Sequence, residues 1–255
     1  GPMLANLTLG RERPSAHMPF DRHRGPPPVA ELPTTSFVFR LDAGALDRFI
    51  DEGGPGRAGE ATFSRQDAVA AFIWTLVASA QRDGDERHLS LVFNARKALE
   101  LGAGYIGNAI VSRTVSMGTA EFGTCVLEEL ARKLRALSHT VTREAVSEDL
   151  AFCQSRLMDG TLASYVNHLY QLNLGSGLLI NNTTSFPLSD IDFGSGPPSW
   201  YDLPHLALNR MIILHESLGA AGGIEVHATL PRDEHGRLLE TLTGHGIPFG
   251  PPHDA

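Results

Sequence analysis

The segment around residues 63–77 constrains the fold most, because it is typical of a helix that must be covered over a broad face. Ser64 is placed to cap its N-terminus, and Asp67, three residues later, can return the capping hydrogen bond. Apolar pairs spaced four residues apart follow, Phe72 with Leu76 and Ile73 with Val77. Such a helix has to bury its apolar face against a second layer of structure.

The apolar periodicity of the rest of the sequence predicts this second layer. Six stretches are apolar or alternating enough to predict strands: 35–41, 89–94, 109–115, 178–182, 211–216 and 224–230. Further helices are predicted over 43–51, 124–138, 147–172 and 233–242. The order mixes strands and helices without a strict βαβ rhythm. The sequence therefore predicts an α+β fold, a mixed β-sheet covered by helices on one face.

The N-terminal stretch differs from the rest in composition. Residues 1–33 are polar and carry Arg-Gly-Pro-Pro-Pro at 24–28, which predicts an irregular arm over the surface. Gly1-Pro2 ahead of Met3 is typical of a protease-cleavage scar, so Met3 is the expected natural start. Residues 34–255 are expected to form one domain.

Charge and cysteine content narrow the classes of partner. The net charge of −8 at pH 7 argues against nucleic acid and anionic membranes as partners. No apolar run approaches the ~18 residues of a membrane span. Two cysteines, Cys125 and Cys153, are too few for a disulfide framework or a CxxC metal site. We therefore expect a cytoplasmic, reducing location and no metal.

The run Asp192-Phe193-Gly194-Ser195-Gly196 predicts a tight turn, because two glycines one residue apart permit positive φ. Asp-Phe-Gly is also the magnesium-binding tripeptide of protein kinases. That class requires a Gly-rich loop, a strand lysine and a His-Arg-Asp loop, and the sequence has none of them. The glycines and the aspartate are therefore interpreted as a structural turn.

Several further motifs stand in order around this run. They are Pro19-Phe20-Asp21-Arg22, the Ser64 helix with Trp74, Asn94-Ala95-Arg96, Tyr105-Ile106-Gly107-Asn108, Thr184-Ser185-Phe186 and Gly222-Gly223-Ile224-Glu225-Val226. Together with DFGSG, they resemble the C-terminal half of BAHD-type acyl-CoA-dependent acyltransferases, whose mark there is DFGWG. Phe186 and Ser195 replace tryptophans of the family pattern. The HxxxDG motif, which supplies the family's catalytic histidine from its N-terminal half, is not found.

The resemblance implies a chloramphenicol-acetyltransferase-like half-fold with acyl-CoA as a co-substrate and no covalent cofactor. It implies that Thr184 and Ser185 lie beside the CoA channel and that Tyr105 and Asn108 belong to a packing segment. It also implies an ion pair between Asp192 and a neighbouring arginine, for which Arg96 is the candidate.

Two histidines are candidate catalytic residues. His17 begins a literal H-x-x-x-D with Asp21, although Pro19 and Arg22 fit the family's later P-x-x-D-R segment instead. His168 lies in a predicted helix beside Asn167. The alternative for each is a structural role, as a hydrogen-bonded histidine that takes no part in catalysis.

Three functions remain open. The chain could be an acyltransferase-derived protein of secondary metabolism that completes its small-molecule site with a complementary N-terminal half. It could be a repurposed homodimeric enzyme, free of cofactor, that guides cyclisation or rearrangement of a small hydrophobic substrate. It could be a non-catalytic remnant that binds a ligand or partner. An apolar surface at the missing half would favour self-association or a partner.

Overall fold

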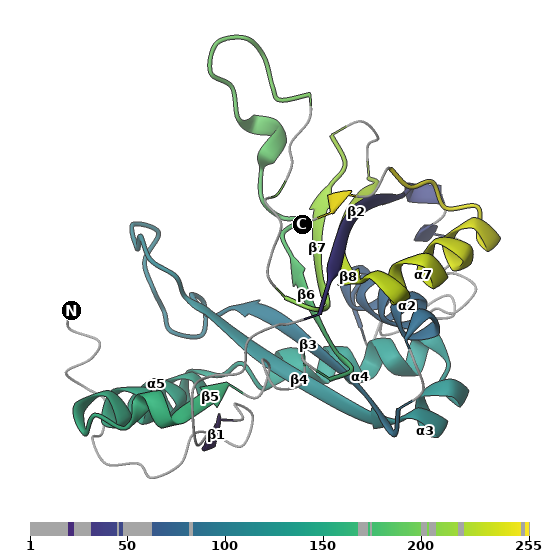
Figure 1. Cartoon of the computed structure of the whole chain (residues 1–255). Coiled ribbons are helices and arrows are strands. Elements are labelled where there is room, and N and C mark those ends of the chain that lie inside the picture. Colours follow the sequence, from purple (N-terminus) through teal and green to yellow (C-terminus); the bar gives the residue numbers. More distant parts are fainter. Residues whose placement is uncertain are drawn as a thin grey trace.

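The computed structural model describes residues 20–22, 32–44, 46–47, 63–81, 84–167, 173, 175–199, 203, 208–218, 222–250 and 253–254. Seven strands form its main sheet (Figure 1): β2 (Thr34–Leu41), β3 (Glu86–Asn94), β4 (Ile110–Gly118), β6 (Gly177–Asn182), β7 (Met211–Glu216), β8 (Ile224–Pro231) and β9 (His253–Asp254). The longer helices are α2 (Arg65–Ala80), α4 (Leu127–His139), α5 (Arg143–Met158) and α7 (Arg232–Gly244). A short helix, α3 (Thr119–Thr124), precedes α4.

The sheet is mixed, with strand order β4-β3-β6-β7-β8-β2-β9. β3, β6 and β7 are parallel neighbours, and the other pairings are antiparallel. β2 is inserted between β8 and β9, so the N-terminal part of the chain completes a sheet built mostly from later strands. The predicted α+β class and mixed sheet are confirmed.

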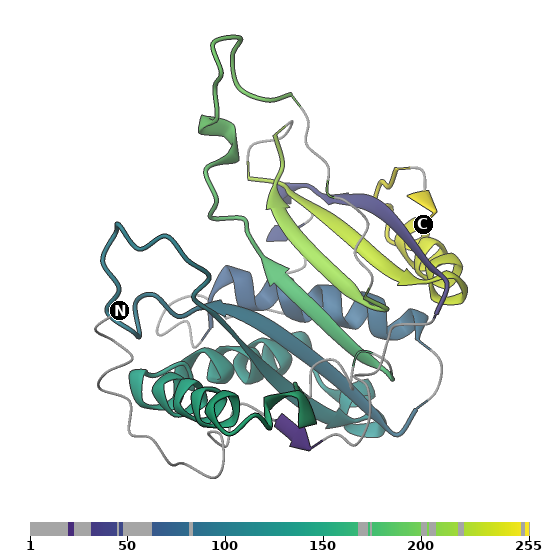
Figure 2. The same cartoon turned by 60° about the vertical axis from the view of Figure 1, so that its left-hand side comes forward.

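Helices cover one face of this sheet (Figure 2), as predicted. α2 lies against both α4 and α7, and its apolar residues join those of alternate strand positions in a single core. α5 reaches the same layer beside β4, where Asp149 pairs with Arg113 in the interior. The α2 prediction is confirmed in detail: the Ser64 amide donates to Asp67 Oδ2 at 2.7 Å, and the Asp67 amide donates to Ser64 Oγ at 3.3 Å.

Two predicted helix boundaries are wrong. The helix expected over 147–172 is α5, which ends at Met158 because Gly160 adopts φ +72° and stops the helix. A 3₁₀ turn, η2 (Leu162–Ser164), and a short strand, β5 (Tyr165–Asn167), follow it. The helix expected over 124–138 is divided at the extended residues Cys125 and Val126, which separate α3 from α4.

The arm predicted over 1–33 is not irregular throughout. Residues 20–22 form a strand, β1 (Phe20–Arg22), which pairs with β5 in a separate two-stranded sheet. Of the short helix expected over 43–51, residues 43, 44, 46 and 47 are helical, and its remainder lies outside the described residues. The boundary between arm and domain stays a prediction.

No helix in the described part of the chain combines the length and apolar character needed to cross a membrane.

Candidate functional site

A pocket lies where the N-terminus of α2 meets the carboxyl ends of β6 and β7. Its volume is about 330 Å³, and it is lined by Arg65, Gln66, Val69, Asn182, Thr184, Glu216, Gly222, Gly223 and Ile224. β6 and β7 are parallel, so the carboxyl ends of both strands lie at the same edge of the sheet. Ligands commonly bind at such edges.

One wall of the pocket is positively polarised. The capping box occupies the Ser64 and Asp67 amides, whereas the Arg65 and Gln66 amides lie in the first helical turn and have no intrahelical acceptor. The Arg65 guanidinium donates to the Gly222 carbonyl at 3.3 Å and lies 3.7 Å from an Asp47 carboxylate oxygen. The Arg65 side chain is 46% exposed, so it can still reach a ligand.

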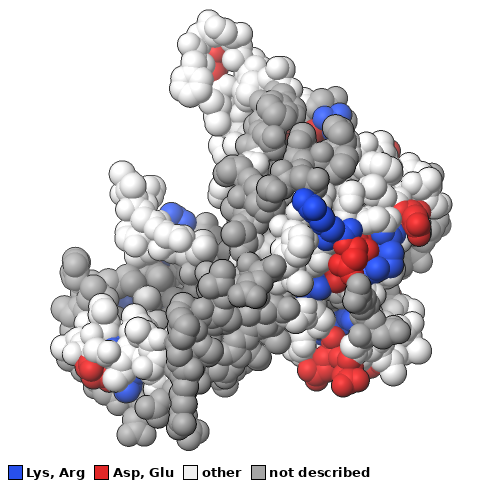
Figure 3. All heavy atoms as spheres, in the orientation of Figure 1, with Lys and Arg blue, Asp and Glu red and all other residues white. Residues whose placement is uncertain are grey.

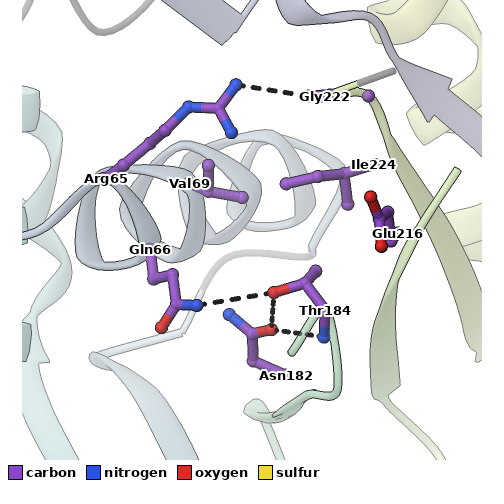
Figure 4. A pocket seen from close by; sticks show the side chains of 9 residues that line it. Arg65, Gln66, Val69, Asn182, Thr184, Glu216, Gly222 and Ile224 are labelled. Carbon is purple, nitrogen blue, oxygen red and sulfur yellow. Dashed lines mark hydrogen bonds between the residues drawn. The ribbon is translucent and has the colours of Figure 1, made fainter. Parts of the chain in front are cut away.

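The floor of the pocket is a small polar network (Figure 4). Asn182 Oδ1 accepts from the Thr184 amide at 3.0 Å and from the Thr184 hydroxyl at 2.7 Å. The Gln66 side-chain amide donates to the same hydroxyl at 3.5 Å. Glu216 stands on the wall away from Arg65 in Figure 4, so the cationic and anionic side chains are separated across the cavity.

Thr183 and His215 brace this edge from the opposite face of the sheet. The Thr183 hydroxyl donates to the Leu214 carbonyl at 2.8 Å and lies 2.8 Å from His215 Nδ1. Burial, with the neighbouring His227 second, lowers the pKa of His215 to about 4. The imidazole is therefore neutral at physiological pH and acts as a fixed hydrogen-bonding group.

The predicted site residues separate into distinct places. Thr184 lines the pocket, whereas Ser185 is exposed beyond it. Asp192 Oδ1 accepts from the Gly194 amide at 2.6 Å and the Gly196 amide at 3.0 Å, and both glycines have positive φ. The candidate histidines His17 and His168 lie outside the described residues.

Arg96 does not pair with Asp192. Its Nη2 donates to the Gly107 carbonyl at 2.6 Å, and its guanidinium carbon lies 5.9 Å from the centre of the Tyr105 ring. Arg96 thus stabilises its own loop, and Asp192 accepts hydrogen bonds from the backbone of its own turn. Asn108 follows the Gly107 carbonyl in the same exposed loop.

Neither cysteine is activated as a nucleophile. Burial raises the pKa of Cys125 to about 11, and the adjoining Glu129 adds to the effect. Burial also raises the pKa of Cys153. Both side chains therefore stay as thiols at neutral pH. Within the described ranges, no three His, Cys, Asp or Glu side chains converge as metal ligands.

The model of the Transferase family, which is of BAHD type, matches residues 33–239. The chain belongs to this family.

Several solved structures share the fold of this chain. TRI101 from F. graminearum, solved with ethyl coenzyme A, has a TM-score of 0.69 at 14% identity over 95% of this chain and 56% of its own. TRI101 from F. sporotrichioides, solved with coenzyme A and T-2, gives 0.68 at 14% identity over 94% and 55%. Vinorine synthase gives 0.60 at 19% identity over 85% and 49%. A search of curated protein sequences found no match.

The chain therefore spans about half the length of the structures that it matches. At this level of identity the likeness establishes the fold, a chloramphenicol-acetyltransferase-like α+β fold. The family motif predicted Thr184 as a site residue, whereas the sequence did not predict the other polar pocket residues, Arg65, Gln66, Asn182 and Glu216. The signal for the first two was their position directly after the N-cap of a buried helix.

Proposed function

We propose that this chain forms one side of an acyl-CoA and acceptor site of a BAHD-type acyltransferase of secondary metabolism, and that a partner half supplies the catalytic base. The observation that carries the proposal is the pocket between the positive end of α2 and the ends of β6 and β7. TRI101, which shares the fold, has been solved with coenzyme A and T-2 mycotoxin.

The chemistry of the pocket suits segments of coenzyme A. The Arg65 guanidinium and the first-turn amides of α2 suit a phosphate oxygen. Gln66, Thr184 and Asn182 present amide and hydroxyl groups that suit the amides of the pantetheine arm. A volume of about 330 Å³ lies at the small end of ligand pockets, so it would hold one segment of such a ligand. The rest would contact the partner half.

Calorimetric titration with coenzyme A tests this proposal. We expect saturable binding that Arg65→Ala weakens by about tenfold, the loss of one charge-assisted contact of ~1.4 kcal/mol. Arg132→Ala is the matched control, because the Arg132 side chain is also 46% exposed and pairs with an acid, Glu128, away from the pocket. Equal affinity of the two variants would contradict the assignment.

Titration with adenosine 3′,5′-bisphosphate and with pantetheine then locates the segment. Binding of the bisphosphate alone, sensitive to Arg65→Ala, would assign the pocket to the nucleotide end. Binding of pantetheine alone, sensitive to Thr184→Val, would assign it to the arm. No heat with any of the three ligands would favour the repurposed, cofactor-free alternative or a binding remnant.

A further inference from the structure

Two loops project from the same edge of the sheet (Figures 1 and 2). The first, residues 95–109, joins β3 to β4, and the second, residues 183–199, follows β6. β3 and β6 are parallel neighbours, so both loops must leave at the carboxyl ends of adjacent strands. Figure 1 shows them reaching away from the core, one at the left and one at the top.

Both loops carry large apolar side chains in solvent. Ile106 is 100% exposed and Phe193 is 96% exposed, the two extreme values among the large hydrophobic residues of the described chain. The same loops also expose Tyr105, Phe186 and Ile191. A cluster of this kind on projecting segments is typical of an interaction surface, because an isolated soluble domain gains nothing from it.

The loops differ in charge. The first carries Arg96 and the exposed Lys97. Among the described residues, no acid forms an ion pair with Lys97. Its single acid, Glu100, is paired with Arg143. The second carries Asp190 and Asp192 and no basic residue. Figure 3 shows blue on the first projection and red on the second, each surrounded by uncharged surface.

We propose that these loops form a two-fold interface with a second copy of this chain, in which the 95–109 loop of each copy lies against the 183–199 loop of the other. In a two-fold interface each contact is made twice, so one chain can satisfy both of its loops by self-pairing. Lys97 would face Asp190 of the second copy, with Ile106 and Phe193 buried between them.

A second copy is favoured over other occupants because the complementary features are both present on this one chain. The exposed apolar side chains of one loop meet those of the other, and the basic loop meets the acidic loop. The inference goes beyond the proposed function, since it needs neither coenzyme A nor acyl transfer. Failure of one therefore leaves the other standing.

Sedimentation equilibrium between about 1 and 100 μM tests the inference. We expect a monomer–dimer equilibrium whose dissociation constant rises at least about tenfold in Ile106→Ser/Phe193→Ser. Leu157→Ser/Met158→Ser is the matched control, because these residues at the end of α5 are 67% and 68% exposed and lie away from both loops. It should leave the dissociation constant unchanged.

A charge swap tests the pairing itself. Lys97→Glu should weaken the dimer, and adding Asp190→Lys should restore it, because the two changes reverse one cross-copy contact. Circular dichroism checks that the variants, altered only at exposed loop positions, keep their fold. A protein that is monomeric throughout, or a dimer indifferent to the Ile106/Phe193 change, would overturn the inference. The former result would assign the loops to a different polypeptide.

Discussion

Nδ1 of His215 lies 2.8 Å from the hydroxyl oxygen of Thr183, which in turn donates to the Leu214 carbonyl. This link ties the end of β7 to the residue that follows β6. The next residues in each segment, Glu216 and Thr184, line the pocket from the other face of the sheet. The hydrogen bonds of Thr183, on the face of the sheet opposite the pocket, thus hold in place the backbone that carries the pocket residues.

The neutral state of His215 predicts acid sensitivity. The pKa of this histidine is 6.5 before it is perturbed by folding and about 4 in the folded protein. The unfolded state therefore binds more protons between these values, and the stability of the fold should decrease as the pH falls from 6.5 to 4. A difference of this size corresponds to a few kcal/mol, at about 1.4 kcal/mol per pKa unit.

Chemical denaturation at about pH 7 and at about pH 4.5, which together span most of this pH range, measures the loss in the free energy of unfolding. His215→Gln, which can still hydrogen-bond to Thr183, should lose less stability than the parent between these pH values. His139→Gln, at the exposed end of α4, removes a histidine elsewhere and should retain the full loss. A His215→Gln profile that matches the parent would refute the assignment.

The pair Arg113–Asp149 should matter more than any surface ion pair. The two side chains are 1% and 3% exposed and lie 3.3 Å apart. Arg113→Ala removes a buried cation from beside a buried carboxylate, so we expect a loss of about 3–5 kcal/mol in the free energy of unfolding. Arg132→Ala, which breaks an exposed pair, should cost less than about 1 kcal/mol.

Removing both partners separates burial from pairing. Arg113→Met/Asp149→Leu deletes the charges together and should recover most of the stability lost in Arg113→Ala. A double variant no more stable than the single one would show that packing around β4, rather than charge, dominates. Urea denaturation of the three proteins decides the matter.

The Ser64 cap should contribute measurably to stability. Ser64→Ala removes the hydroxyl that accepts from the Asp67 amide, and we expect a loss of about 1 kcal/mol. Thr75→Ala, an exposed position inside the same helix, should be neutral or slightly stabilising because alanine is the better helix former. Thermal denaturation followed by circular dichroism compares the two, and equal shifts would contradict a special role for the cap.

Two glycines should respond to alanine with opposite signs. Gly222 lines the pocket at φ +74°, and an added Cβ would stand 3.4 Å from the Ala43 Cβ, so Gly222→Ala should cost about 1–2 kcal/mol. Gly236 lies inside α7, where an added Cβ would meet no described atom within 4 Å apart from the backbone of its own helix. Gly236→Ala should stabilise by about 1 kcal/mol. Matching signs in a urea titration would exclude the backbone explanation.

Local patterns predicted the elements better than their arrangement. The Ser64–Asp67 box and the apolar run at 178–182 each depend on neighbours in the sequence, and both are confirmed. The end of α5 was missed because the apolar residues beyond it outweighed the turn signal at Asp159-Gly160. The adjacency of β3 and β6 has no local signature, because residues 95–176 lie between these two strands and only tertiary contact brings them together.

The candidate site shows the same limit. Thr184 was reached through a motif, because the family pattern records its position directly. Arg65 and Glu216 come from the start of a helix and the end of a strand far apart in the chain, and only the folded sheet brings them to one cavity. The Asp192 turn was readable from its two glycines, whereas the partner of Arg96 was decided by the shape of its own loop.

The place of β2 in the sheet bears on how the chain acquires its structure during synthesis. β2 leaves the ribosome before the other strands of this sheet, yet both of its partners, β8 and β9, come last among them in the sequence. Phe37 and Phe39, which belong to the core, therefore wait without their neighbouring strands until nearly the whole of this sequence has emerged. Long-range pairing of this kind leaves an apolar strand open to association with other chains in the meantime. The sheet closes last at the strand that was made first.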